Sequence, residues 1–295
     1  MILLTGAAGA VGRALLRRLV DGDEPVRCLV RDPRRLGAER VRVQIALGDL
    51  ADPGAHRNAM RGVRLVVHLA ASMRDQPGAT IEEINAVATL RLVRAAERAG
   101  VERFVYCSCL GASEHSTSRL MRAKALAERV VEQAAVPSVV VAPSMIYAPE
   151  NRWLRFLDRA SAVLPAVPLD RRGPGTLRSR SSPTTWPRAS QPSWPADPPP
   201  GGSRAELAGP DVLTFAEVLE LAMAGRGRRR PVLAVPRPVA VALLRAAEGL
   251  LGVGTPVTED EAALVGVSML AREGTSHAEA LGVRPLAMAE VLGPA

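Results

Sequence analysis

Three glycines spaced three residues apart, Gly6, Gly9 and Gly12, could contact a phosphorylated ligand through bare backbone. The short apolar run at 2–4 predicts a buried parallel strand before them, and the apolar spacing of 13–20 predicts a helix after them. Strand, glycine turn and helix in this order are typical of a dinucleotide-binding turn, in which the glycines allow a tight bend, close approach of a pyrophosphate and close helix packing. The diphosphate would then lie on unpaired N–H groups at the helix N-terminus. An ordinary glycine-containing turn is the alternative.

The end of the second expected strand, 26–30, bears on which dinucleotide binds. NAD-specific sites place an acidic residue there for the ribose hydroxyls, but this chain has Arg31. A planar guanidinium suits the 2′-phosphate of NADP, because it can donate two parallel hydrogen bonds to phosphate oxygens. Asp32, one position later, could instead serve NAD, and a solvated loop of charges would serve neither. We therefore favour NADP(H) and keep NAD(H) as the alternative.

Further strands alternate with helices and predict an α/β fold, a Rossmann-type doubly wound parallel sheet. In such a sheet ligands lie at the carboxyl ends of the strands. Asp49 follows the third strand and could face an adenine or begin the next helix as a cap. Ala70 and Ala71 form the carboxyl end of the fourth expected strand and leave space for a cofactor, whereas His68 inside that strand is expected to pack in the core. The expected strands are 41–46, 65–71, 104–108 and 138–142, and the expected helices include 81–99 and 116–135.

Composition excludes several classes of function. The 295-residue chain carries a net charge of +8, but its arginines are scattered among acids and aromatic residues make up only 3%, which argues against nucleic-acid binding. No apolar run reaches the roughly 18 residues of a membrane span, and the first strand starts at once, so neither span nor signal peptide is expected. The three cysteines favour a reducing, cytoplasmic location. No metal constellation is expected, since the four histidines are dispersed. The apolar segment 238–251 is expected to be core, with contact to a membrane surface or partner as the alternative.

Several segments together resemble the atypical or extended short-chain dehydrogenases/reductases. The similarity covers residues 1–165 and returns near 207–215. Within that superfamily the chain is similar to the NAD(P)H-binding group, which includes NmrA-like proteins and the NADPH-binding accessory subunit of respiratory complex I. The resemblance rests on residues 5–12, 48–50, 68–71, 85, 100–106, 124–128 and 143–147. Together with Arg31, which the chemistry at the end of the second strand indicates, it implies a cofactor site made of Gly6, Ala8, Gly9, Ala10, Val11, Gly12, Asp49, Leu50, Ala70, Ala71, Asn85, Lys124 and Pro143.

The same resemblance implies a reaction centre that is incomplete in this chain. Active members use a Ser or Thr after the fifth strand and a Tyr-x-x-x-Lys on the next helix, with the tyrosine as general acid/base. Lys124 matches the lysine, but Leu120 stands where the tyrosine should be and cannot transfer a proton. The serine position falls on Ser108 or, in the better alignment, on Cys109. Tyr106 and Tyr147 could substitute, although nothing in their spacing requires it.

Lys124 is the only lysine among 38 basic residues. Its retention in so arginine-rich a chain suggests a position that needs a compact ammonium, such as a ribose contact, rather than a guanidinium. Chance retention on a solvated helix face is the alternative.

Residues 169–206 do not follow the alternating pattern and are rich in Pro, Arg and Ser. Proline at this density favours a flexible linker. The genetic code offers a sharper hypothesis. Suppose that the codons for residues 182–187 have G at each free third position. Translation that starts at the last base of the codon for Ser182 then gives Ala-Asp-Asp-Val-Ala. Relatives carry an Asp-Asp-Val-Ala-type segment here, so we expect a local shift of reading frame, restored before Leu207. The expected organisation is a dinucleotide-binding domain at 1–168, this aberrant segment, and a mainly helical substrate or partner part at 207–295.

Two functions remain open. The first is an NADP(H)-dependent oxidoreductase or epimerase-like enzyme acting on an unknown small molecule. The second is a non-catalytic NADP(H)-binding redox sensor, or an assembly or accessory protein that contacts a respiratory complex or the surface of a membrane. A usable proton donor would favour the enzyme, and Leu120 counts against it.

Overall fold

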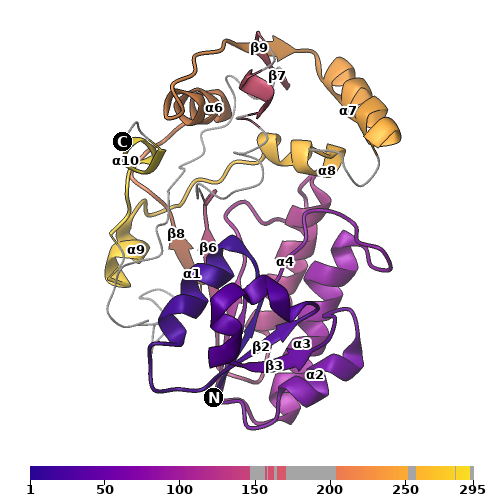
Figure 1. Ribbon diagram of the computed structural model, residues 1–295, viewed down its shortest axis with the longest axis vertical. Coiled ribbons are helices and arrows are strands. Elements are labelled where there is room, and N and C mark those ends of the chain that lie inside the picture. Colours follow the sequence, from indigo (N-terminus) through magenta and orange to yellow (C-terminus); the bar gives the residue numbers. More distant parts are fainter. Residues whose placement is uncertain are drawn as a thin grey trace. The chain divides into compact units, whose positions relative to one another are not determined.

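The computed structural model describes residues 1–146, 157, 159–162, 165–170, 204–251, 257–282 and 284–292 (Figure 1). Its contacts divide the chain into two compact units. The first contains residues 1–143 together with 204–206 and 277–282, and the second contains the other described residues. The division thus falls at the end of a strand near residue 143, earlier than the limit expected at 168.

The first unit is built on a sheet whose order is β3-β2-β1-β4-β5-β6-β8. Each pairing from β3 through β6 is parallel. The strand order reverses between β1 and β4, which makes their carboxyl ends the expected ligand site of a doubly wound sheet. The predicted α/β Rossmann-type class is therefore confirmed. The strands are β1 Ile2–Thr5, β2 Val26–Val30, β3 Gln44–Leu47, β4 Leu65–His68, β5 Arg103–Cys107, β6 Ser138–Pro143 and β8 Arg204–Leu207.

Because the strand order reverses at β1, right-handed crossovers place the helix after β1 on one face of the sheet and the helices that lead into β4, β5 and β6 on the other. The helices that lead into β4, β5 and β6 share one apolar cluster with the strands, in which Leu3, Val66 and Phe104 are completely buried. The helix after β1 buries leucines of its own, Leu15 and Leu16 among them. The helical elements are α1 Ala10–Leu19, η1 Pro33–Arg42, α2 Pro53–Ala59, η2 Glu83–Val87, α3 Ala88–Arg98 and α4 Arg119–Glu132.

Several predicted elements differ in their bounds. The fourth strand, expected to reach Ala71, ends at His68. The third strand was expected to start at Val41, but η1 extends through Arg42 and β3 begins at Gln44. Val41 is 80% exposed, so its β-branched side chain is not drawn into the sheet by burial. The long helix expected at 81–99 begins with the π-helical turn η2 before continuing as α3.

Caps explain where two short helices begin. Asp52 precedes α2 and accepts a hydrogen bond from Gly54 N at 2.9 Å. Asp32 precedes η1 and accepts one from Arg34 N at 3.0 Å. The cap of α2 is thus Asp52 and not Asp49, which removes one of the two roles considered for Asp49.

The second unit is mainly helical, as predicted, and has a small parallel sheet of β7 and β9. Its helix α6 starts with a capping box, in which Thr214 and Glu217 bond each other's backbone N–H. Val218 and Met223 of this helix are buried with Leu169 in an apolar cluster. The elements are β7 Val167–Asp170, α6 Phe215–Ala224, β9 Val232–Val235, α7 Arg237–Leu251, α8 Glu259–Ala262, η4 Ala263–Gly266 and α10 Met288–Leu292, while α9 Ser276–Ala280 lies across the division.

Most of the aberrant segment, residues 171–203, lies outside the described residues, so the reading-frame hypothesis stays a prediction. Its last residues are regular, because Arg204 opens β8 and pairs with Glu128 at 3.1 Å and with Glu206 at 2.5 Å. In the described part of the chain, no helix combines the length and apolarity needed to cross a membrane. The same part holds no group of three or more His, Cys, Asp or Glu side chains that could share a metal ion.

Candidate dinucleotide site

The sequence-predicted residues gather at one edge of the first unit's sheet. The glycine turn follows β1, Arg31 follows β2, Asp49 lies just beyond β3, and Ala70 lies just beyond β4. Because these strands are parallel, their carboxyl ends share this edge, where open α/β sheets bind ligands.

The backbone contacts of the glycine turn show why Gly6 and Gly12 cannot carry a side chain. Gly6 has a φ of +74°, and a Cβ built on it would lie 2.6 Å from the backbone N of Ala70. A Cβ on Gly12 would lie 2.1 Å from the carbonyl oxygen of Gly6. Gly9 has more room, since its Cβ would lie 3.3 Å from that same oxygen. The backbone of the turn therefore packs tightly against the residues that follow β4, and a side chain on Gly6 would prevent this contact.

Helix α1 begins directly after this turn and is suited to an anion. Gly9 is its N-cap and supplies no side chain, and the first turn contains no acidic residue. The first N–H groups of a helix have no partner within it and carry its positive partial charge. Ala10, Val11 and Gly12 therefore present backbone donors where a diphosphate would neutralise them. The structure thus fits the dinucleotide predicted from the sequence.

Arg31 and Asp49 meet beside this turn, with 3.6 Å between Nη1 of Arg31 and Oδ2 of Asp49. Both side chains are about half exposed, at 54% and 46%, so a ligand can reach the guanidinium. Asp32 is committed elsewhere. Its carboxylate accepts from Arg34 N and, at 2.9 Å, from Arg34 Nε. Arg34 also lowers the pKa of Asp32 by these hydrogen bonds.

Behind the turn, buried polar side chains form a series of hydrogen bonds that the sequence did not indicate. His68 lies opposite Thr5 in the parallel register of β1 and β4, and its Nδ1 is 2.6 Å from Thr5 Oγ1. Its Nε2 is 3.0 Å from Oγ1 of Thr89 on α3. Burial, followed by the nearby charge of Lys124, lowers the pKa of His68 to about 3. The expectation of a core histidine agrees with this placement, but the ring is hydrogen-bonded on both sides.

Asn85 is buried in the π-helical turn and holds the loop that follows β4. Its Nδ2 donates to the carbonyl oxygens of Ser72 and Ile81, both at 2.8 Å, and its Oδ1 accepts from Ser72 N at 3.2 Å. These bonds occupy the amide and hold the loop in place, and the predicted contact of Asn85 with a cofactor stays a prediction. Single π-helical turns inside helices recur at functional sites.

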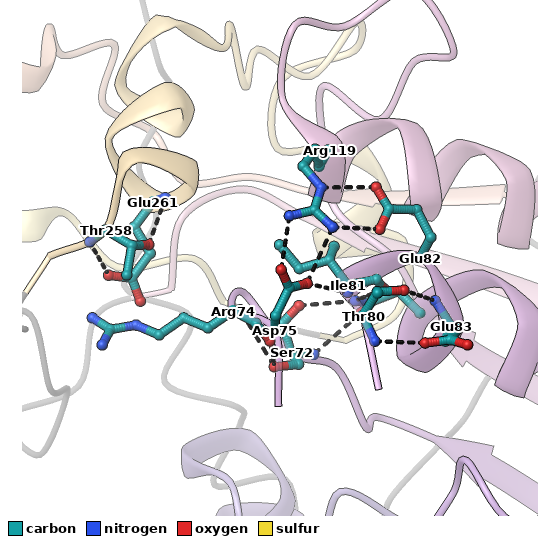
Figure 2. Close-up of polar contacts among 11 residues, drawn as sticks. Ser72, Arg74, Asp75, Thr80, Ile81, Glu82, Glu83, Arg119, Thr258 and Glu261 are labelled. Atoms are coloured by element: carbon teal, nitrogen blue, oxygen red, sulfur yellow. Dashed lines mark hydrogen bonds and ion pairs between the residues drawn. The ribbon is translucent and has the colours of Figure 1, made fainter. Parts of the chain in front are cut away.

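Figure 2 shows that Arg119, at the start of α4, also holds the loop that follows β4, through ion pairs. Its guanidinium donates to Asp75 at 3.0 Å and to Glu82 at 2.7 Å. Asp75 Oδ1 also accepts from Ile81 N at 2.8 Å. Arg119 lowers the pKa of Asp75 and of Glu82 chiefly through these side-chain hydrogen bonds. The pattern of charges in the sequence gave no indication of this cluster, because its members are separated by up to 44 residues.

Lys124 is buried on α4 with its ammonium at the end of β5. Its Nζ donates to the carbonyl oxygen of Cys107 at 2.7 Å and lies 4.8 Å from the centre of the Tyr106 ring. Leu120, one helical turn earlier, is buried on the same helix. Lys124 thus lies beside the end of β5 and its contact with a cofactor stays a prediction, while an apolar side chain fills the position expected for the tyrosine.

The remaining candidates for acid/base chemistry are poorly suited to it. Burial raises the pKa of Cys109 to about 11, and its Sγ lies 3.4 Å from Met121 Sδ. Ser108 is buried at 4% exposure, and its Oγ has no hydrogen-bond partner among the described residues. Tyr106 is fully buried in β5, which raises its pKa well above its usual value. Tyr147 lies outside the described residues.

Of the other residues predicted to contact the cofactor, some are accessible and some are packed in the core. Ala8 is half-buried in the glycine turn, and Ala71 is exposed beyond β4. Leu50 packs against the apolar cluster under α2, and Pro143 is buried at the end of β6. Contacts of all these residues with a cofactor stay predictions.

Solved structures of similar fold include an NADPH-dependent quinone oxidoreductase from Escherichia coli in complex with NADPH, with a TM-score of 0.72 and 19% identity over 99% of this chain and 98% of that chain. The triphenylmethane reductase of Citrobacter sp. in complex with NADP(H) has the same TM-score, with 18% identity over 99% of each chain. At these identities the likeness shows the fold.

Several curated proteins have a higher sequence identity to this chain than these structures do, but they match a shorter part of it. The ceramide reductase of Caulobacter vibrioides is 31% identical over 57% of this chain and 53% of its own. Photosystem II assembly factor Ycf39 of Cyanophora paradoxa is 29% identical over 45% and 41%. NADH dehydrogenase [ubiquinone] 1 alpha subcomplex subunit 9 of Mus musculus is 29% identical over 56% and 45%. The chain spans about half the length of these relatives.

The family model described as NAD(P)H-binding matches residues 6–164, which begin at the first glycine of the turn and continue beyond β6. That match covers more than half of the chain, and it includes the glycine turn, Arg31 and Lys124. The chain belongs to the NAD(P)H-binding family, in the atypical short-chain dehydrogenase/reductase group.

Proposed function

We propose that this protein binds NADP(H) in preference to NAD(H), with the 2′-phosphate on Arg31. The observation that carries this proposal is the arrangement after β2. Arg31 is half exposed and holds one ion pair with Asp49, whereas the carboxylate of Asp32 is engaged by Arg34. A ribose without the 2′-phosphate needs a free carboxylate here, and a ribose with it needs a guanidinium.

The other contacts follow from the same edge of the sheet. The diphosphate would lie on the backbone N–H groups of Ala10, Val11 and Gly12, and the ammonium of Lys124 would contact the nicotinamide ribose. A bound nicotinamide would supply or accept a hydride. This chain would orient it through the turn after β1, the loop after β4 and Lys124.

The Arg31→Ala variant tests this preference. We expect its NADPH dissociation constant to rise at least tenfold, equivalent to about 1.4 kcal/mol, because a charge-assisted phosphate contact is lost. Affinity for NADH should change less than threefold. Arg17→Ala removes the same charge from the last turn of α1 and should change neither affinity. An equal loss for both nucleotides in Arg31→Ala would contradict the assignment of Arg31 to the 2′-phosphate.

A second candidate function is that of an NADP(H)-binding accessory or assembly protein without turnover. It is favoured by Leu120 in the proton-donor position, by the raised pKa of Cys109, and by the assembly factor and complex I subunit among the relatives. The protein loaded with NADPH distinguishes the two functions. Oxidation of the nucleotide on addition of a quinone, as the name of one structural neighbour suggests, would support an oxidoreductase. Retention of reduced nucleotide against quinone and carbonyl acceptors would support the non-catalytic function.

A further inference from the structure

We propose that His68 is a positioning residue for the dinucleotide, which fixes the glycine turn relative to β4 and α3 through a directed chain of hydrogen bonds. This chain, the His68 relay, consists of Thr5, His68, Thr89 and the backbone of Asn85 and Ala70. The inference rests on the proposed dinucleotide site and adds residues that do not themselves touch the ligand.

The direction of the relay follows from the donors at its two ends. Thr89 Oγ1 donates to the carbonyl oxygen of Asn85 at 2.6 Å, so it must accept from His68 Nε2–H at 3.0 Å. A neutral imidazole protonated on Nε2 has an acceptor at Nδ1, which takes the hydroxyl proton of Thr5 at 2.6 Å. Thr5 Oγ1 in turn accepts from Ala70 N at 3.4 Å. All polar groups of the relay are thus satisfied by one tautomer.

The relay connects the three elements that shape the candidate site. Thr5 ends β1 immediately before Gly6, whose backbone is packed against Leu69 and Ala70 beyond β4. Thr89 lies one helical turn after Asn85, which holds the loop at Ser72. A shift of His68 would therefore move the phosphate-binding turn and the loop after β4 relative to each other.

The polar side chains of the relay are fully buried, so each needs a hydrogen-bond partner within the protein. Thr5, His68 and Thr89 are each 0% exposed. A buried polar group that loses its partner is strongly unfavourable, so the three side chains hold one another in a single arrangement. The aromatic rings of Tyr106 and Phe104 flank the imidazole with centroids 5.6 Å and 6.2 Å away, which limits its rotation. Such a rigid support is what a preorganised binding turn requires.

Matched pairs of threonine variants test the proposal in the full chain. Thr5→Val and Thr89→Val keep the shape of the side chain and remove the hydroxyl, whereas Thr5→Ser and Thr89→Ser keep the hydroxyl. We expect both valine variants to raise the NADPH dissociation constant at least fivefold, and both serine variants to stay within twofold of the wild type. Thr89 is the sharper site, because it lies on α3, away from the glycine turn.

Affinity for adenosine 2′-monophosphate separates positioning from a general loss of structure. This fragment lacks the diphosphate and nicotinamide, so it should bind the valine variants within twofold of the wild type. Equal loss of both ligands, or wild-type NADPH affinity in folded Thr89→Val, would overturn the proposal. Failure of the wild type to bind NADPH would instead refute the proposed function.

The tautomer can be measured without any variant. In ¹⁵N NMR spectra of the wild type at pH 7, the imidazole of His68, assigned by comparison with His68→Asn, should be neutral with its proton on Nε2. A proton on Nδ1, or on both nitrogens, would overturn the directed relay.

Discussion

Replacing Gly12 with alanine is expected to abolish dinucleotide binding and to destabilise the N-terminal unit. The new Cβ would lie 2.1 Å from the carbonyl oxygen of Gly6 and 2.7 Å from Cα of Ala7, and both of these contacts are backbone. Relief therefore requires α1 to move away from β1, with a cost of about 1–3 kcal/mol or more. Urea unfolding and NADPH titration of the purified variant measure the two effects.

Two other glycines are matched controls for that result. Gly9→Ala leaves 3.3 Å to the same carbonyl oxygen, so stability should change by less than about 1 kcal/mol while NADPH affinity falls, because the methyl group lies where the diphosphate must approach. Gly266→Ala meets nothing within 4 Å and should change neither property. Unchanged binding in both Gly12→Ala and Gly9→Ala would contradict the assignment of the turn to the diphosphate.

The free energy of unfolding should fall as the pH is lowered from 7.5 to 5, and His68 should account for a large part of the loss. Burial lowers the pKa of His68 to about 3, while the unfolded chain has a histidine pKa near 6.5. At a pH between these two pKa values, His68 binds a proton in the unfolded state but not in the folded state. The stabilisation is therefore fully present above the unfolded-state pKa and is lost as the pH falls below it. One such group contributes about 2 kcal/mol over this interval.

The His68→Asn variant measures that contribution directly. Urea unfolding at pH 7.5 and pH 5 should show a smaller loss of stability in the variant than in the wild type. His56, whose pKa burial also lowers, remains in both proteins and cancels in the comparison. Because the lowered carboxyl pKa values of Asp75 and Glu82 act nearer pH 4, the interval above pH 5 isolates the histidines. Parallel losses in the two proteins would show that His68 is not held neutral.

The sheet could be predicted because buried parallel strands have continuous apolar sequences. The runs expected at 65–71 and 138–142 both form strands, although the first ends three residues early, at His68. The error at Val41 came from reading a β-branched run as a strand, although that side chain is 80% exposed and belongs to η1. The π-helical turn at Glu83–Val87 was missed because its apolar spacing is that of the helix it opens.

The candidate site was predictable where one segment carries the whole signal, as in the glycine turn and Arg31. The His68 relay and the Arg119 cluster were not predictable, because each joins residues from different elements. Thr5 and His68 meet only through the register of β1 with β4, and Arg119 reaches Asp75 across 44 residues. A histidine inside an apolar strand was the one available signal, and it indicated burial without naming the partners.

The most direct test of the account is titration of the full chain with NADPH and with NADH, followed by nucleotide fluorescence. We predict saturable binding of NADPH with a dissociation constant of about 1 μM or below, equivalent to about −8 kcal/mol, and at least tenfold weaker binding of NADH. Equal affinity for the two would refute the role of Arg31 and leave the dinucleotide site intact. Binding of neither would contradict the central claim that the turn after β1 receives a nicotinamide dinucleotide.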